Sequence, residues 1–515
     1  MYQQTAAKPA KTRSATQQAP VKGWNGRDSL DAMEEGYAVR LCNIFPETNY
    51  VSLRKGYRVH ATGMGSGAVQ TLAELVTEAG TRKLVACANG NIYDASTYNA
   101  AATSLDSGFT SNKWQTANFR NKLILVNGAD QPQQYDGSAV SDAAYTGIAD
   151  DANLISVEVY KSRLYFVQKD TASVWYGGVD AITGGLTEFD VGSLLRLGGY
   201  VMYAGSWSND SGAGMQDLFV IVSSMGETLI YNGTYPGEDG TTAGAEAWQL
   251  VGRYFLPVPL GRRAFMNLAG DLVILTDQGA VSLAAVFAQG KDEIYRLVTD
   301  LIADPYQDGA RAYAANFGWC GLSYPRGHMA IINVPTVADG NADQWVMNTL
   351  SGAWTKFQNI KASSWSTYSD KPYFGGMDGK VYEFDTGADD AGDVIDFEIK
   401  TAFNYFGDRR SEKRFLMARP LFIGDTAMRF LMNVDCDFED RTITDTITTT
   451  GVSGAEWDVA SWDTSSWDGG ATYRADWYDL SGHGRCAALR IKGSSTNALF
   501  NLSAINVTFE IGGLM

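Results

Sequence analysis

The sequence predicts an all-β protein, and three observations support this prediction. Glycine is frequent, with 55 of 515 residues, and proline is rare, with 12, so the chain can turn often without proline's fixed φ. Aromatic residues make up 12% of the chain and charged residues 19%, a composition that suits pleated, half-buried surfaces. Finally, a pair of short apolar segments recurs along most of the chain.

The recurring pair begins with an apolar strand that follows a polar residue. This first segment occurs at residues 83–86, 122–126, 163–167, 217–221, 271–275, 328–332 and 371–374. The second segment, usually ending in an aromatic residue and a turn, occurs at residues 92–94, 134–137, 175–178, 230–233, 281–283, 346–348 and 381–383. Two strands joined by a loop that contains Gly, Asn or Asp predict a β-hairpin.

The spacing of the hairpins indicates how they assemble. The markers Tyr93, Tyr135, Tyr176 and Tyr231 lie 42, 41 and 55 residues apart, which suits a four-stranded propeller blade of about 40–50 residues. Blades that pack around an axis bury each other's faces. We therefore predict a β-propeller of six to eight blades over residues 63–387. Unrelated hairpins in a sandwich or a solenoid are the alternative.

Two segments precede the propeller. Residues 1–22 have no hydrophobic centre and carry their cations before the first acid, Asp28, so we expect a disordered or extended N-terminal arm. An opening segment, residues 23–62, follows.

A helical insertion is predicted near residues 292–303. Ile294, Leu297, Val298 and Leu301 form one apolar stripe at helical spacing. Asp292 is a suitable cap, and Pro305 would follow the end of the helix.

A separate C-terminal β domain is predicted over residues 388–515. The hairpin repeat fades after Asp385, and residues 386–393 have the composition of a linker. Expected strands cover residues 394–401, 413–423, 427–434, 486–492 and 504–511. Their alternation of apolar and polar residues predicts an antiparallel β-sandwich with one solvated face.

Charge and composition exclude several functions. The chain has 41 basic and 58 acidic residues, a net charge of −17, which argues against a protein that coats nucleic acid. No apolar run approaches the ~18 residues of a transmembrane segment. The five cysteines are far apart and form no CxxC pair, so we interpret them as reduced core residues.

The sequence offers little for catalysis, and we predict no enzyme, no cofactor and no metal. His60, His328 and His483 belong to no catalytic or metal-binding motif, and no phosphate-binding loop or nucleophile elbow is present. The many carboxylates leave a glycosidase pair open. The acidic residues of segment 435–440 would suit a calcium ion or, more simply, a solvated acidic turn.

Two features are candidates for partner binding. Trp457, Trp462 and Trp467 recur every five residues and, with Trp477, belong to a Trp-rich loop, residues 455–480; tryptophan is enriched at binding hot spots. The alternative is that they pack on their own subunit.

The second candidate is the basic cluster, Arg409, Arg410, Lys413 and Arg414. It would suit DNA phosphates or a neighbour's carboxylates. Ordinary surface pairing is the alternative.

The opening segment carries a family resemblance. Residues 39–47, with Asn43 and Pro46 in an N-x-x-P pattern, precede Leu53-Arg54-Lys55-Gly56-Tyr57. Together they resemble the opening of tail nozzle proteins, or packaged-DNA stabilisation proteins, of short-tailed podovirus-type bacteriophages. That opening leads from N-x-x-P into L-R-x-x-G; here Lys55 stands where proline is common and the spacing differs.

The resemblance implies a structural virion protein of the phage tail, assembled in the host cytoplasm. Such a subunit forms a homo-hexameric ring at the distal DNA channel, retains the packaged genome and allows its ejection. Its partners would be the portal-adaptor protein and tail fibres or spikes, with genomic DNA passing through the lumen without sequence-specific binding. The alternatives are a carbohydrate-binding or glycan-cleaving propeller, such as a tail adhesin or depolymerase, and a propeller scaffold.

Overall fold

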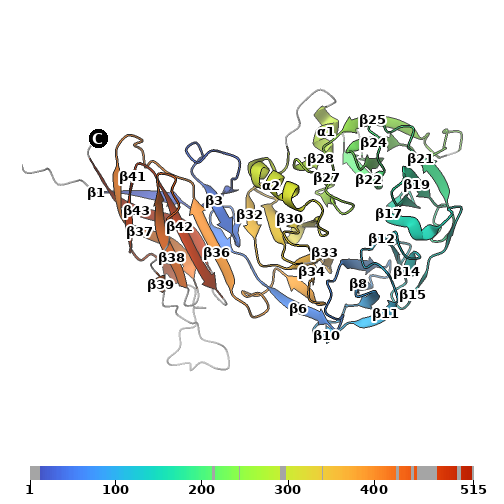
Figure 1. The fold of residues 1–515 in the computed structure, drawn as a ribbon, viewed down its shortest axis with the longest axis horizontal. Coiled ribbons are helices and arrows are strands. Elements are labelled where there is room, and N and C mark those ends of the chain that lie inside the picture. Colours follow the sequence, from blue (N-terminus) through green and yellow to red (C-terminus); the bar gives the residue numbers. More distant parts are fainter. Residues whose placement is uncertain are drawn as a thin grey trace, which may run out of the picture. The chain divides into compact units, whose positions relative to one another are not determined.

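Strands dominate the computed structural model, which describes residues 12–210, 215–242, 244–289, 297–338, 340–424, 429–441, 446–448, 472–495 and 500–512 (Figure 1). The chain divides into two units. Unit 1 comprises residues 1–58, 345–358 and 385–515, and unit 2 comprises residues 59–344 and 359–384.

All seven predicted hairpins are confirmed. Their first strands are β8 (Arg82–Ala88), β13 (Lys122–Val126), β18 (Arg163–Gln168), β23 (Met215–Ser223), β27 (Asp271–Leu275), β30 (Met329–Val334) and β34 (Lys371–Gly376). Their second strands are β9 (Asn91–Asp94), β14 (Gln133–Tyr135), β19 (Ser173–Tyr176), β24 (Glu227–Asn232), β28 (Ala280–Ser282), β31 (Asp343–Asn348) and β35 (Val381–Phe384). The chain passes from unit 2 to unit 1 within β31.

Six of the hairpins belong to small sheets of unit 2, and the hairpin of β30 and β31 belongs to a ten-stranded sheet. In each case a first strand precedes the hairpin. These first strands are β7 (Thr71–Val76), β12 (Gln115–Phe119), β17 (Leu154–Tyr160), β22 (Val201–Asp210), β26 (Phe265–Leu268), β29 (Cys320–Tyr324) and β33 (Ala362–Tyr368). A fourth strand follows the hairpin in some sheets: β11 (Thr103–Ser107), β15 (Val140–Asp142), β21 (Thr187–Asp190) and β25 (Gln249–Phe255). In the last sheet, β6 (Tyr57–Thr62) lies beside β35, and β10 (Ala100–Ala101) pairs with β6. A short pair, β16 (Tyr145–Thr146) and β20 (Gly184–Gly185), completes the unit.

Consecutive sheets of unit 2 share hydrophobic cores, because side chains alternate between the two faces of each strand. On β7, Leu75 points to the core shared with the second sheet, which includes Leu125. Leu72 points to the other face, where it packs with Tyr373 of the last sheet. The sheets follow one another around the unit (Figure 1), and β33 contacts β7.

The helix predicted near residues 292–303 lies partly outside the described residues, and its described part, residues 297–303, is not α-helical before Ala303. The helices are α1 (Leu283–Gln289) and α2 (Ala303–Tyr313), with short 3₁₀ turns η1 (Asp151–Asn153), η2 (Asp300–Ile302) and η3 (Pro325–Gly327); residues 290–296 lie outside the described part. Val298 N–H donates to the Ala280 carbonyl, and the Thr299 hydroxyl accepts from Ala280 N–H. This stretch is therefore bound to a strand end. Pro305 lies in the first turn of α2, where a helix needs no proline N–H.

Unit 1 contains one antiparallel sheet and the larger part of a second sheet, in which some neighbouring strands pair in parallel. The first has the order β4 (Ile44–Pro46), β5 (Val51–Leu53), β43 (Asn501–Ile511), β37 (Lys413–Gly424) and β40 (Thr472–Arg474), with β41 (Tyr478–Gly484) also paired to β37. The second contains β32 (Trp354–Phe357), β2 (Gly23–Trp24), β3 (Tyr37–Cys42), β36 (Ile395–Thr401), β42 (Ala487–Ser495), β38 (Arg429–Cys436) and β39 (Thr446–Thr448). The five strands predicted for the C-terminal region are thereby confirmed.

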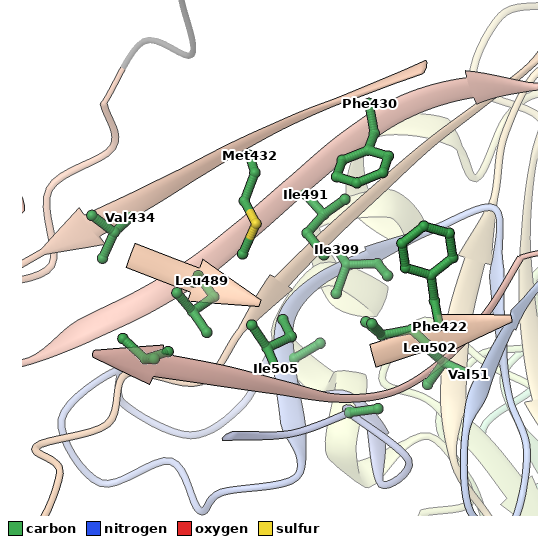
Figure 2. Close-up of a cluster of buried hydrophobic side chains, with 14 of the residues drawn as sticks. Val51, Ile399, Phe422, Phe430, Met432, Val434, Leu489, Ile491, Leu502 and Ile505 are labelled. Carbon is green, nitrogen blue, oxygen red and sulfur yellow. The ribbon is translucent and has the colours of Figure 1, made fainter. Parts of the chain in front are cut away.

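The two sheets of unit 1 enclose one hydrophobic core (Figure 2). Phe430 and Ile491 come from the second sheet, and Phe422 and Ile505 come from the first; all four are at most 1% exposed. Their strands alternate inward apolar with outward polar residues, which is the pattern of a sheet that is buried on one face.

The N-terminal arm is ordered where the structure describes it. Residues 12–18 form β1 (Thr12–Gln18), which pairs antiparallel with β43 from Thr12 opposite Glu510 to Gln18 opposite Ala504. Of the two forms expected for the arm, disordered or extended, these residues adopt the extended one, because β43 offers a free edge that β1 completes. Residues 1–11 lie outside the described part.

Candidate functional site

The two halves of the opening motif bind each other inside unit 1. Arg54, whose side chain is 0% exposed, donates through Nε to Asn43 Oδ1 at 2.9 Å. Its Nη1 and Nη2 donate to the two carboxylate oxygens of Asp390 at 2.8 and 2.6 Å. Asn43 in turn donates to the Asp396 carbonyl and accepts from Gln358 N–H. We call Asn43, Arg54 and Asp390 the opening knot.

Gly56 allows the chain to pass beside the opening knot. A Cβ atom on Gly56 would lie 1.6 Å from the Asp389 carbonyl oxygen, so only glycine fits without a backbone shift. Tyr57 N–H and Gly56 N–H donate to the carbonyls of Asp389 and Gly387. The L-R-K-G segment is thereby bonded to the linker that precedes β36.

The basic cluster is only partly a surface feature. Arg410 and Arg414 are exposed, and the Arg409 guanidinium stacks on Tyr405 at 4.6 Å. Lys413 is 0% exposed, and its Nζ donates to the carbonyls of Asp408, Ser411 and Arg485. The prediction that Lys413 binds a partner is therefore wrong, because its buried ammonium group donates its hydrogen bonds to three main-chain oxygens.

The Trp-rich loop is mostly beyond what the structure describes. Trp457, Trp462 and Trp467 lie outside the described residues. Trp477 is 40% exposed, and the Arg419 guanidinium lies 4.9 Å from its ring. Trp477 therefore presents a half-exposed indole face beside β41.

The acidic turn of unit 1 is neutralised by its own chain. Asp435 and Asp440 both bind Lys400 Nζ, and Asp440 also pairs with Arg40. Asp437 accepts the N–H groups of Arg485 and Cys486. No group of three or more potential metal ligands occurs within the described ranges.

The three histidines serve local structure. His60 is buried, with Nε2 3.1 Å from the Ala95 carbonyl and its ring against Tyr373. His483 Nε2 lies 2.7 Å from Glu412 Oε2, and His328 has a positive φ at the end of η3. None of these contacts forms a nucleophile–base pair.

Unit 2 contains a cationic pocket that was not predicted from the sequence. Its volume is about 460 Å³, within the ~300–1,000 Å³ range of small-molecule sites. The loops that line it contribute Lys113, Lys169, Arg262 and Arg263, together with Phe317. Lys169 lies in the turn between β18 and β19, and the other four lie between successive sheets. No carboxylate belongs to the lining.

The two arginines of the pocket donate hydrogen bonds to main-chain carbonyl oxygens. Arg263 donates to the carbonyls of Gln70 and Trp114 and to the Thr71 hydroxyl, at 2.6–2.7 Å. Arg262 Nη1 donates to the Val201 carbonyl at 3.0 Å. Burial lowers the pKa of both guanidinium groups, yet arginine stays charged in proteins.

The two lysines and Phe317 complete the pocket. Lys113 Nζ lies 4.5 Å from the Phe317 ring centre and Arg263 Cζ lies 5.0 Å from it, so one ring holds two cations. Among the described residues, Lys169 Nζ donates to the Gly128 carbonyl alone, at 3.4 Å. Both lysine side chains are exposed.

Glu158, a carboxyl group elsewhere in unit 2, has a raised pKa. Glu158 lies on β17, and a Cβ atom on Gly205 of β22 would lie 3.1 Å from its Cγ. Burial raises the pKa of Glu158 to about 7. Within the described ranges Glu158 has no ion-pair partner, so its titration reports burial rather than a catalytic pair.

The comparisons identify no family. No family model matches the sequence, and no curated protein matches it. Among solved structures, YCF48 bound to a D1 peptide is 9% identical with a TM-score of 0.39, over 66% of this chain and 96% of that one. PorZ, a surface component of the type-IX secretion system of Porphyromonas gingivalis, is 12% identical with a TM-score of 0.36, over 64% of this chain and 38% of that one. Chaetomium thermophilum Raptor is 8% identical with a TM-score of 0.39, over 64% and 29%.

These likenesses are too weak to indicate an activity. The helices that the structure describes are all too short or too polar to span a lipid bilayer.

Proposed function

We propose that this chain is a structural subunit of a phage virion, the tail nozzle of a short-tailed phage, and that it performs no catalysis. The observation that carries the proposal is the opening knot. The residues that carry the family resemblance, Asn43 and Arg54, are bonded to each other and to the linker that starts the C-terminal region. The two motif residues thus bond segments of unit 1 that are more than 300 residues apart in sequence, and this shared contact supports the resemblance.

We infer further that the sheets of unit 2 close into a seven-bladed propeller. The last sheet shares a core with the first, and β6, which precedes all the other strands of unit 2, completes the last sheet. Arg263, just before β26, reaches the starts of β7 and β12, 192 and 149 residues away. A ring that brings its first and last sheets together protects most of its strand edges.

In this proposal the nozzle assembles in the host cytoplasm as a homo-hexamer and joins the portal-adaptor protein and tail fibres or spikes. Its net charge of −17 supports a channel that passes DNA without holding it, because acidic surfaces repel phosphates. The exposed Arg410 and Arg414, without Lys413, are the part of the basic cluster that remains available to a neighbouring subunit's carboxylates.

Electron microscopy of the purified full chain tests the proposal. The expected result is a sixfold ring with a central hole, formed by the chain alone or on addition of the adaptor ring. The charge reversal Arg410→Glu with Arg414→Glu should weaken assembly, whereas Arg326→Glu, in unit 2, should not. A chain that stays monomeric with its adaptor and releases sugar from a glycan would overturn the proposal.

Gel-shift analysis tests the passage of DNA separately. At about 150 mM salt the full chain should not retard a duplex, because non-specific affinity comes mainly from phosphate neutralisation and falls with salt. Stable retardation at that salt would contradict a channel that lets the genome slide.

A further inference from the structure

We propose that the cationic pocket of unit 2 binds a small polyanion that carries two or more phosphate groups. The proposal does not depend on the nozzle function, because the pocket lies within one chain. Three features of the pocket support the proposal: its excess of positive charge, its free hydrogen-bond donors and its size.

The pocket concentrates positive charge in an acidic protein. Lys113, Lys169, Arg262 and Arg263 line it, although acids outnumber bases 58 to 41 in the chain. Within the described ranges, Asp170 is the only carboxylate within 4 Å of any of the four, at 3.7 Å from Arg262 Nη2, and it is 66% exposed. Four cationic side chains and one exposed carboxylate, Asp170, give the pocket a net positive charge.

The adjacent Asp130 forms no ion pair with any of the four cations within the described ranges, and its negative charge is stabilised by hydrogen bonds from the chain around it. Its carboxylate accepts N–H groups from Thr110 and Ser111, the Thr110 hydroxyl and the Asn127 amide. These donors occupy both of its oxygens. The carboxylate is therefore held by the loop that carries Lys113 and by its own turn.

The N–H groups that remain free to donate hydrogen bonds belong to the two lysines. Arg262 and Arg263 use N–H groups on main-chain oxygens and act mainly as fixed charge. Lys113 Nζ has only the face of Phe317 as its partner within the described ranges, and Lys169 Nζ makes one long hydrogen bond. Two ammonium groups therefore have N–H donors free for the oxygens of a ligand.

The size of the pocket selects the ligand class. A cavity of about 460 Å³ holds a small molecule, and loops from several sheets surround it, so a DNA duplex cannot enter. Several negative charges on one small molecule are needed to match the cations. Oligophosphates carry that charge density and offer many acceptor oxygens.

Isothermal titration of the full chain with inorganic triphosphate tests the proposal. We expect one site per chain, with affinity that falls as salt is raised. Lys113→Gln and Lys169→Gln should each weaken binding about fivefold or more, because each removes a charge-assisted contact. Lys361→Gln is the matched control, since Lys361 is an exposed lysine of the same unit outside the pocket. Both pocket lysines are exposed, and unchanged circular dichroism will verify folding.

Three outcomes would overturn the proposal: no triphosphate binding, equal weakening by Lys361→Gln, or full displacement of triphosphate by a short DNA duplex. The last result would make the lysines part of a nucleic-acid surface. Binding of triphosphate by a chain that never forms rings would uphold the pocket while refuting the nozzle, so the two proposals fail separately.

Discussion

Replacing Arg54 by methionine should destabilise unit 1 more than any surface charge change. The substitution leaves Asp390, which is 3% exposed at its side chain, as a buried carboxylate without its two guanidinium donors. Removing one partner of a buried ion pair costs about 3–5 kcal/mol. For a unit of roughly 200 residues, each kcal/mol shifts Tm by about 2–4 °C, so Tm should fall by roughly 6–20 °C.

Differential scanning calorimetry measures this shift, and hydrogen exchange in β37 and β43 assigns it to unit 1. Arg40→Met is the matched control: Arg40 is 44% exposed and pairs with Glu398 and Asp440, so its loss should cost at most about 1 kcal/mol. Adding Asp390→Asn to Arg54→Met should recover about 1–3 kcal/mol, because no buried charge then remains. Equal Tm losses for Arg54→Met and Arg40→Met would refute this reasoning.

Three further predictions concern single residues. Lys413→Met should lower the free energy of unfolding by about 2–4 kcal/mol in urea titrations, since three carbonyls lose their donor; Arg410→Met should leave it within about 0.5 kcal/mol. Gly56→Ala should cost about 3 kcal/mol or more, because its Cβ would overlap a carbonyl oxygen, whereas Gly177→Ala, with 3.8 Å of space, should be near neutral by thermal melting. Because burial raises the pKa of Glu158 to about 7 from 4.5, the native state binds a proton that the unfolded state has lost, and stability should fall as pH rises from 4.5 through 7. Glu158→Gln should remove that fall and gain about 1–3 kcal/mol at pH 8; an unchanged pH profile would show that Glu158 is not the group responsible.

The hairpins were predictable because their signal is local. In β8, Leu84 and Ala86 face one core and Val85 and Cys87 face the other, so the strand is a continuous apolar run in the sequence. The prediction of a helix near residues 292–303 fails over residues 297–299. There Val298 and Thr299 bind the end of a strand, and such a long-range contact leaves no periodic pattern in the sequence.

The sites were less predictable, because burial and charge balance depend on the assembled fold. Lys413 looked like its neighbours Arg410 and Arg414 in sequence. Its burial involves a long-range contact with the carbonyl of Arg485, 72 residues away, which the sequence does not show. The cations of the pocket lie on separate loops. Apart from the pair Arg262-Arg263, no local pattern distinguishes them from other surface charges.

Arg54 and Arg263 show why the two proposals rest on different residues. Each is a partly or fully buried arginine that bonds segments far apart in sequence. Arg54 meets a carboxylate bidentately, so its charge is cancelled and its role is to hold unit 1 together. Arg263 meets only carbonyls and a hydroxyl, which satisfy its N–H groups but leave its charge uncancelled. Lys113 contacts the same Phe317 ring as Arg263, so a second positive charge lies nearby. The uncancelled charge of Arg263 favours an external anion, whereas an arginine with only a structural role would not need an uncancelled charge.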